Sequence, residues 1–172
     1  ATFGIFNSPT LRPLRFGTWV GGDRDGNPNV THELTRRILD LQHERALKLF
    51  APAVAELAQT LSQSTRIVEI SQELTKSLED DRAELPAVWD EFKGLDEEEP
   101  YRLKCAYIYE RLQNSIEASE GGPASGKLRY TNVEPLLADL QVMIESLKAN
   151  QGSESADGEV RRLTQRISAF GM

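Results

Sequence analysis

Residues 17–31 read Gly-Thr-Trp-Val-Gly-Gly-Asp-Arg-Asp-Gly-Asn-Pro-Asn-Val-Thr, and this stretch divides the chain into two unlike parts. Up to its end the sequence is rich in glycine and proline, which are typical of turns and extended connections. Beyond it, apolar residues recur at the three- and four-residue spacing of a helix face. We therefore expect a single domain with an extended lead-in and glycine-rich turn over residues 1–30 and an α-helical segment over residues 31–172.

The first helix is expected to begin after Thr31, whose hydroxyl suits the N-cap position, and to end near Ser62. Glu33 falls in its first turn, where the helix dipole favours an anion. Pro52 falls in the middle and should kink or break the helix, because proline lacks the amide hydrogen of the helical ladder. One face of this helix should be buried, and it carries Leu47, Phe50, Val54, Leu57 and Leu61.

Later segments repeat the helical pattern. Pro100 suits the first position of a helix, and Thr131 with Glu134 has the spacing of a capping box. Leu14–Val20 is short and aromatic, and it is the best candidate for a strand. Further helices are expected over residues 68–84, 87–92, 100–118, 132–149 and 160–170. The residues expected to be buried in the last three are Tyr101, Cys105, Ile108, Leu112, Ile116, Val133, Leu136, Leu140, Ile144, Leu147, Val160, Leu163, Ile167 and Phe170.

These patterns predict a mainly α fold, an antiparallel helical bundle with a short N-terminal strand or loop lead-in. A lone strand is not stable by itself and needs partners that this sequence does not obviously supply. The chain also starts at Ala1 without an initiator methionine and stops within an apolar run at Met172. We therefore expect it to be an interior fragment of a longer polypeptide.

The composition argues against several classes of protein. The 172 residues include 20 basic and 27 acidic residues, a net charge of −7, whereas nucleic-acid binders usually present a basic face. No apolar run approaches the roughly 20 residues that a membrane-spanning helix needs. Cys105 is the single cysteine, so no intrachain disulfide can form, and a reducing cytoplasm fits best. Two histidines and one cysteine leave little room for a zinc site.

The segment most suited to binding a ligand is the glycine-rich turn from Gly21 to Pro28. Its glycines permit a tight turn and let backbone amides approach an anion. Arg24 offers a planar cation suited to phosphate or carboxylate, while nearby aspartates could orient it or bind a cation. The helix expected after Thr31 adds a positive dipole. The candidate anion-binding residues are Gly21, Gly22, Asp23, Arg24, Asp25, Gly26 and Asn27.

The turn does not match the common loop motifs. A phosphate-binding P-loop ends in Gly-Lys followed by Ser or Thr, which is absent here, and the glycines lack the spacing of a dinucleotide fingerprint. A calcium loop beginning at Asp23 would have Pro28 in place of its central glycine and Leu34 in place of its final glutamate. A purely structural connection from strand to helix therefore remains an alternative, because glycine, aspartate and asparagine are common in turns.

Residues 16–31, the turn with the phenylalanine before it, closely resemble a signature stretch of the phosphoenolpyruvate carboxylases. The block from Gly21 to Pro28 is the most specific part of the resemblance, which covers most of residues 10–172. The weaker matches are Glu-Pro-Tyr-Arg at 99–102, Tyr-Glu-Arg-Leu at 109–112, residues 136–147, Ala-Asp-Gly at 156–158 and Ile-Ser-Ala-Phe-Gly-Met at 167–172.

The resemblance implies an enzyme that adds bicarbonate to phosphoenolpyruvate, giving oxaloacetate and phosphate, with Mg²⁺ or Mn²⁺ as cofactor. It implies a (β/α)8 barrel elaborated by many helices, in an enzyme that is usually a homotetramer. The segment before Gly21 would be an early barrel strand, and the helices would be an excursion before the next strand. The turn would then lie at the C-terminal end of a strand, where such barrels build their active sites. The implied partners are the rest of the enzyme and its subunits, with no nucleic acid and no membrane.

The motifs that the resemblance would place in the catalytic centre are missing from this stretch. It contains no Thr-Ala-His-Pro-Thr motif, no His-Gly-Arg-Gly-Gly loop and no matching acidic metal ligands. Phosphoryl chemistry needs several groups held around metal and substrate, which Arg24 alone cannot supply. We therefore expect no catalytic or metal-binding residue in this chain, no bound cofactor and no activity of the chain by itself.

Three roles are open for Arg24. The resemblance implies an anion site for a sugar-phosphate activator near a subunit contact. Alternatively, Arg24 lines the mouth of the active site, or it pairs structurally with Asp23 or Asp25. Another class of function is open for the whole chain, a non-enzymatic helical module that binds a partner protein through an apolar face. The glycine-rich turn separates the two classes, because a helical scaffold has no need for it.

The remaining polar side chains have ordinary explanations. His32 and His43 are about three helical turns, or ~16 Å, apart and cannot share a metal ion. Cys105 lies on an apolar stripe and is expected to be a buried small residue, and Arg36 and Arg37 are expected on a solvated helix face. Apolar helix faces that would pack against a barrel should be exposed in this chain and favour self-association.

Overall fold

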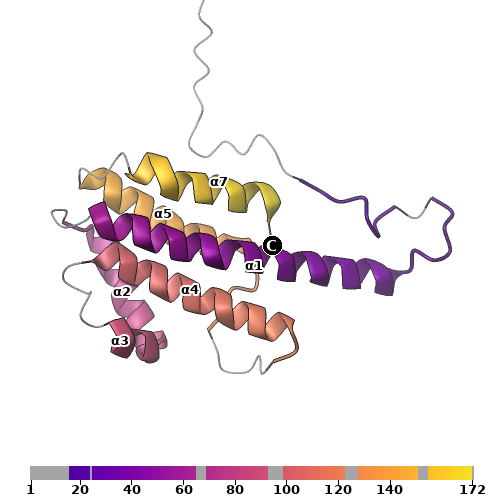
Figure 1. Cartoon of the computed structure of the whole chain (residues 1–172), viewed down its shortest axis with the longest axis horizontal. Helices are drawn as coiled ribbons and strands as arrows, with labels where there is room; N and C mark the ends of the chain where they lie inside the picture. Colours follow the sequence, from indigo (N-terminus) through magenta and orange to yellow (C-terminus); the bar gives the residue numbers. More distant parts are fainter. Residues whose placement is uncertain are drawn as a thin grey trace, which may run out of the picture.

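The computed structural model describes residues 16–23, 25–64, 69–92, 99–122, 128–150 and 155–171, and in these ranges the chain is mainly helical (Figure 1). The expected mainly α class is therefore confirmed. Within the same ranges, no helix combines the length and the apolar character needed to cross a bilayer. The elements are α1 (His32–Ser64), α2 (Gln72–Glu84), α3 (Pro86–Phe92), α4 (Pro100–Ser119), α5 (Val133–Ala149), the π-helical turn η1 (Ala156–Val160) and α7 (Arg161–Phe170).

α1 begins as expected and is longer than expected. The backbone amide of Leu34 donates to the hydroxyl of Thr31 at 3.3 Å, so Thr31 caps the helix. The helix is not broken at Pro52, because α1 continues through it to Ser64. Pro52 is exposed, so water can hydrate the helix carbonyl that would otherwise accept a hydrogen bond from an amide at this position. The packing of α1 against α4 also holds the helix together.

The core lies among α1, α4, α5 and α7, which lie side by side in Figure 1. α1 packs most extensively against α4, and α5 packs against η1 and α7, while α2 and α3 pack against α4. The apolar stripes expected from the sequence are buried, except that Ile116 and Val133 are half-buried and Phe170 is 63% exposed. The helical spacing therefore identified the core.

α2 begins later than expected. It starts at Gln72, after the N-cap Ser71, whose side chain accepts a hydrogen bond from the amide of Leu74 at 3.2 Å. The cap satisfies an amide that has no partner inside the helix, which explains the start at this position. The earlier start expected at residue 68 is wrong for residues 69–71, and residues 65–68 lie outside the described residues.

The expected capping box at Thr131 and Glu134 is not formed. α5 begins at Val133 with Asn132 in the N-cap position, and no side chain caps it. Glu134 is therefore the second residue of the helix, one position too early for the reciprocal contact of a capping box.

The last helix begins earlier than expected. The π-helical turn η1 runs directly into α7, so residues 156–158 belong to it and not to the expected loop. Gly158 departs from helical geometry inside this turn, with φ −84° and ψ −106°. A residue with no side chain tolerates this backbone conformation at low cost.

The expected strand at Leu14–Val20 is not formed by the part of it that the structure describes. Residues 16–20 form no strand, and Leu14 and Arg15 lie outside the described residues. A strand needs a partner to satisfy its backbone, and no strand stands beside this segment in the described ranges.

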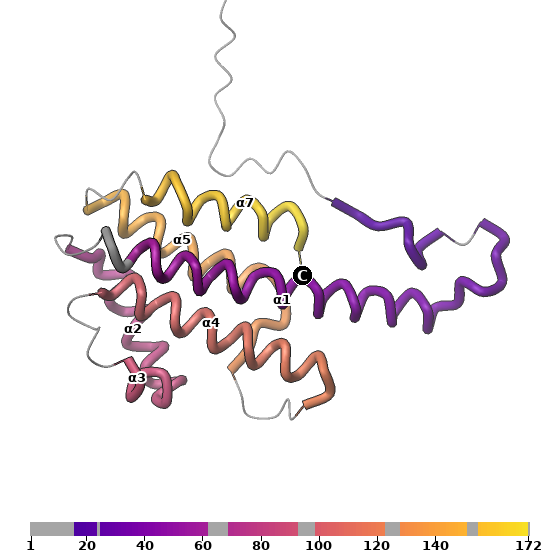
Figure 2. Tube along the Cα trace, viewed as in Figure 1, coloured from indigo at the N-terminus to yellow at the C-terminus, as the bar shows by residue number. Residues whose placement is uncertain are grey.

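The beginning and the end of the described chain meet. The amide of Phe16 donates to the carbonyl of Ala169 at 3.0 Å, and the rings of Phe16 and Phe170 stack with their centroids 5.0 Å apart. Figure 2 shows the tube of the lead-in starting beside the end of α7 and running towards the start of α1. The helices therefore form an excursion that returns to its starting point, and the first half of α1 projects beyond them (Figure 1).

Candidate functional site

The glycine-rich turn has the backbone conformation that its glycines permit. Gly21 and Gly26 adopt φ angles of +70° and +74°, in the left-handed region that other residues rarely enter. Both glycines are therefore required by the shape of the turn, as the sequence suggested.

Gly21 is also the point at which the turn packs on α1. A Cβ atom at Gly21 would lie 2.2 Å from the Cδ1 of Ile38, so a larger residue would have to displace the end of that side chain. The hydroxyl of Thr35 donates to the carbonyl of Gly21 at 2.6 Å. The turn is thus held by one apolar and one polar contact against the second turn of the helix.

Several backbone amides in the turn and just after it donate to acceptors close by in the chain. The donors are Gly22, Asp23, Asp25, Asn29 and Val30, and the acceptors lie on Trp19, Asp23 and Asn27. The amides of Gly26 and Asn27 donate to no other described residue. Both residues are exposed.

The charged side chains of the turn are solvent-exposed where the structure describes them. A carboxylate oxygen of Asp23 accepts the amide of Asp25 at 3.2 Å, and both aspartates are exposed. Arg24 lies outside the described residues. The six other candidate residues are brought together in one turn, whereas the three roles of Arg24 stay open.

The start of α1 already carries an anion. Glu33 pairs with His32 at 2.7 Å between Oε1 and Nε2, and both side chains are exposed. The backbone amide of Glu33 and the hydroxyl of Thr31 lower the pKa of the Glu33 carboxyl. The carboxylate of Glu33 and the cap at Thr31 therefore already place negative charge and an acceptor at this end of the helix. Arg36 and Arg37, on the following turn, are exposed.

The other candidate side chains show no sign of chemistry. His43 is half-buried and lines a hollow of about 350 Å³ between α1 and the end of α7, together with Phe170 and Gly171. Burial raises the pKa of the Cys105 thiol to about 12, so it stays protonated and unreactive near neutral pH. In the ranges that the structure describes, no group of three or more His, Cys, Asp or Glu side chains could hold a metal ion.

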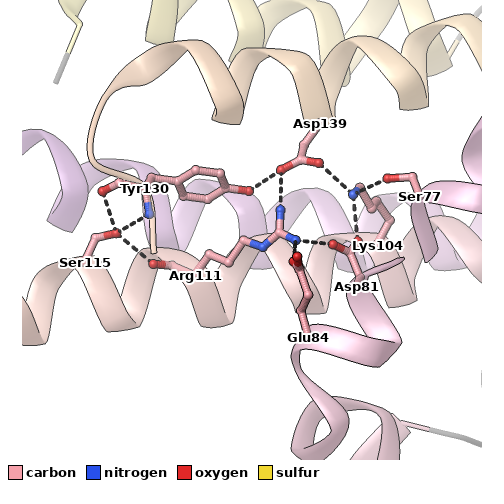
Figure 3. Close-up of polar contacts among 8 residues, drawn as sticks. All are labelled: Ser77, Asp81, Glu84, Lys104, Arg111, Ser115, Tyr130 and Asp139. Atoms are coloured by element: carbon pink, nitrogen blue, oxygen red, sulfur yellow. Dashed lines mark hydrogen bonds and ion pairs between the residues drawn. The ribbon is translucent and has the colours of Figure 1, made fainter. Parts of the chain in front are cut away.

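A second polar site lies inside the helical segment, and the sequence analysis did not predict it. This buried ion cluster consists of Asp81 from α2, Lys104 and Arg111 from α4, and Asp139 from α5 (Figure 3). The Lys104 side chain is fully buried, and Arg111 and Asp139 are each 13% exposed. Two positive and two negative charges balance, as burial of charge requires.

Lys104 lies at the centre of the cluster. Its Nζ donates to the Oγ of Ser77, to Asp81 and to Asp139, each at 2.7 Å. An ammonium group has three hydrogens, so these three bonds satisfy it completely. One side chain of α4 therefore ties α2 to α5.

Arg111 repeats this connection two helical turns further along α4. Its guanidinium donates to Asp139 at 3.0 Å and to Asp81, and it reaches the exposed Glu84 at 3.3 Å. The two carboxylates are thus shared between two cations, which fixes the separation of α2 and α5 along α4.

The cluster extends into the segment before α5. The hydroxyl of Tyr130 donates to Asp139 at 2.5 Å, and the hydroxyl of Ser115 is bonded to both the amide and the carbonyl of Tyr130. Burial, followed by the charge of Asp139, raises the pKa of Tyr130 well above its ordinary value, so the phenol stays a donor. Burial also raises the pKa of Asp81, against the charges of Lys104 and Arg111.

These contacts make the buried ion cluster a structural feature. Each oxygen of its two carboxylates accepts at least one hydrogen bond from within the protein. A catalytic acid or base needs access to substrate, whereas Asp81 and Lys104 are almost fully buried and the carboxylates are paired with cations. Its function is to hold three helices in register.

Sequence reasoning missed the cluster because its partners lie on different helices. Lys104 and Arg111 are seven residues apart and lie beside the apolar stripe of α4, which was a usable signal. No local pattern marks Asp81 or Asp139 as their partners, because residues 23 and 35 positions from Lys104 meet it only in the folded chain.

A family model described as phosphoenolpyruvate carboxylase matches residues 2–172. Among curated relatives, the phosphoenolpyruvate carboxylase of Xanthomonas euvesicatoria pv. vesicatoria is 41% identical over 160 residues, which cover 93% of this chain and 17% of the relative. That of Roseiflexus castenholzii is 37% identical, over 92% of this chain and 18% of the relative. That of Thermosynechococcus vestitus is 35% identical, over 99% of this chain and 18% of the relative. The chain thus spans less than a fifth of the length of these relatives.

Proposed function

The chain belongs to the phosphoenolpyruvate carboxylase family, and from this premise we propose that it is a segment of an enzyme adding bicarbonate to phosphoenolpyruvate, with oxaloacetate and phosphate as products. The family match over residues 2–172 is the observation that carries the proposal. The chain matches less than a fifth of the length of each relative, which supports the proposal that it is a segment of a longer enzyme. The enzyme would act in the cytoplasm as a homotetramer.

Within that enzyme, we propose that the helices form an excursion from a (β/α)8 barrel. The contact between Phe16 and Phe170 supports this arrangement, because it brings the beginning and the end of the described segment together. A helical excursion can be inserted between two neighbouring strands when its ends are adjacent. The glycine-rich turn would then lie near the point where the excursion leaves the barrel.

The catalytic centre and its metal are proposed to lie in other parts of the enzyme. The described residues hold no group of His, Cys, Asp or Glu that fits Mg²⁺ or Mn²⁺, and the buried ion cluster already satisfies its own carboxylates. Phosphoenolpyruvate and bicarbonate would bind there too. We therefore derive no catalytic step from this chain.

The isolated chain is expected to form no oxaloacetate, whereas the complete polypeptide that contains it is expected to be active. The reason is that carboxylation needs a metal and several groups around it, and the part of the chain that the structure describes holds no group of three or more His, Cys, Asp or Glu side chains that could bind a metal ion. Oxaloacetate formation can be followed by coupled reduction with malate dehydrogenase and NADH. Activity of the isolated chain, or an inactive but folded complete polypeptide, would contradict the proposal.

For the glycine-rich turn, we propose an anion site that serves an activator such as a sugar phosphate. The amides of Gly26 and Asn27, which donate to no described residue, support this assignment, as does the presence of Arg24 between two exposed aspartates. The site comprises Gly21, Gly22, Asp23, Arg24, Asp25, Gly26 and Asn27.

Arg24→Ala in the complete enzyme is expected to weaken activation by a sugar phosphate about 10- to 100-fold, since hydrogen bonds to charged groups contribute about 1.5–3 kcal/mol. The measurement is the concentration of activator that gives half-maximal activation, with Arg37→Ala as a matched control on an exposed helix face. A lower kcat/KM without activator would instead indicate a role at the mouth of the active site. An unchanged turnover and activation would leave Arg24 a structural residue.

The second candidate function is a non-enzymatic helical module that binds a partner protein. The exposed apolar side chains Leu39, Leu41 and Leu49 favour it. Such a module would have no need for the positive φ angles of the glycine-rich turn. Inactivity of the folded complete polypeptide would favour the binding module over the carboxylase.

A further inference from the structure

α1 carries a second apolar face, separate from the one buried in the core. This outer stripe consists of Leu34, Ile38, Leu41 and Leu49, which are four, three and eight residues apart. Such spacing places them on one side of a helix. Leu34, Leu41 and Leu49 are 37%, 54% and 56% exposed, so this side has no cover along most of its length.

The outer stripe and the core-facing stripe lie on opposite sides of α1. With 3.6 residues per turn, Leu41 and Val54 are about 140° apart around the helix axis, and Leu34 and Val54 are about 160° apart. Val54 is fully buried in the core. At Val54 the described helices cover one side of α1, whereas the first half of α1, with most of the outer stripe, projects beyond them (Figure 1).

The glycine-rich turn packs on one part of the outer stripe. Its Gly21 lies against Ile38, the member of the outer stripe that is half-buried. Trp19 and Val20, directly before the turn, are 81% and 67% exposed. Eight of the nine large hydrophobic side chains exposed among the described residues lie within residues 16–49 or at Phe170. The exposed apolar surface is therefore concentrated on one part of the molecule.

We propose that the outer stripe, together with Trp19 and Val20, packs against another part of the same polypeptide in the complete enzyme. This inference rests on the proposed function, in which the chain is a segment of a longer carboxylase. The choice of the same polypeptide as the occupant of this surface rests on chain length. The chain covers only 17–18% of its relatives, so most of such an enzyme lies outside it. The position of the lead-in gives a second reason. In the proposed arrangement the rest of the polypeptide joins this segment at the Phe16–Phe170 contact, where the lead-in that carries Trp19 also starts.

The test is thiol labelling of Leu41→Cys in the complete enzyme, followed by peptide mass spectrometry after timed exposure to N-ethylmaleimide. Glu79→Cys, at an exposed polar position of α2, is the matched control. Leu41→Cys is expected to label at least about tenfold more slowly than Glu79→Cys, because a buried thiol reacts only when the structure opens locally. In the 172-residue chain alone, the two positions are expected to label at similar rates, and buried Cys105 should stay unlabelled.

Equal labelling of the two positions in the complete enzyme would overturn the proposal. Protection of Leu41→Cys in the complete enzyme that is lost when its subunits are dissociated would also overturn it, because a second copy would then be the occupant. Oxaloacetate formation by the same preparations tests the proposed function separately. An active enzyme with a rapidly labelled Leu41→Cys would contradict this inference alone, and an inactive polypeptide with a protected one would contradict the proposed function alone.

Discussion

Lys104→Met is expected to lower the free energy of unfolding by about 3–5 kcal/mol, the usual cost of removing one partner from a buried ion pair. The Lys104 side chain is fully buried, and its ammonium group is the donor to Ser77, Asp81 and Asp139. Methionine has a similar length, so the loss comes from charge and hydrogen bonding rather than from a cavity. Two buried carboxylates would then face Arg111 alone.

Urea unfolding of the 172-residue chain, followed by circular dichroism at neutral pH, measures this loss. Lys48→Met is the matched control, because Lys48 makes exposed pairs with Glu44 and Glu120 and its replacement should cost less than about 1 kcal/mol. The double variant Lys104→Met/Asp81→Asn should be less destabilised than the sum of the two single variants, since each single change leaves a charge unpaired. A loss no larger than that of Lys48→Met would show that water screens the cluster.

Ile108→Ala is expected to destabilise the chain by about 2–5 kcal/mol, and Ile108→Val by about 0.5–1.5 kcal/mol. Ile108 is fully buried on α4, the helix that packs most extensively along α1. Each removed carbon loses its transfer free energy, and the cavity left between packed helices adds to the cost.

The same urea titration compares these variants with Leu49→Ala, whose side chain is 56% exposed on α1. That control should change the free energy of unfolding by less than about 0.5 kcal/mol, as surface substitutions usually do. Equal losses for Ile108→Ala and Leu49→Ala would contradict the assignment of Ile108 to the buried core and of Leu49 to the surface.

The helices and the core were predictable because their signals are local. Leu47, Val54 and Leu61 recur every seven residues, so a helix must place them on one face, and that face is buried. The positions of helix ends were less predictable. The N-cap positions fell at Ser71 and Asn132, of which only Ser71 accepts a hydrogen bond with its side chain, because several neighbouring polar residues are suited to the start of a helix.

The glycine-rich turn was predictable in shape and only partly in purpose. The glycines at positions 21 and 26 indicated a tight turn, and both residues have positive φ angles in the structure. The packing of Gly21 on Ile38 could not be read from the sequence, because it depends on how the turn folds back over α1. The anion site stays a proposal, with Arg24 to be tested in the complete enzyme.

By itself, the sequence determined the mainly helical class, most residues of the core and, through residues 16–31, the family resemblance that the family match confirms. Only the tertiary structure decided the buried ion cluster, the meeting of Phe16 with Phe170 and the exposure of the outer stripe. The physical reason is the range of the interactions. Helix periodicity acts within a few residues, whereas the partners of a buried charge or an apolar face are chosen by contacts between distant segments.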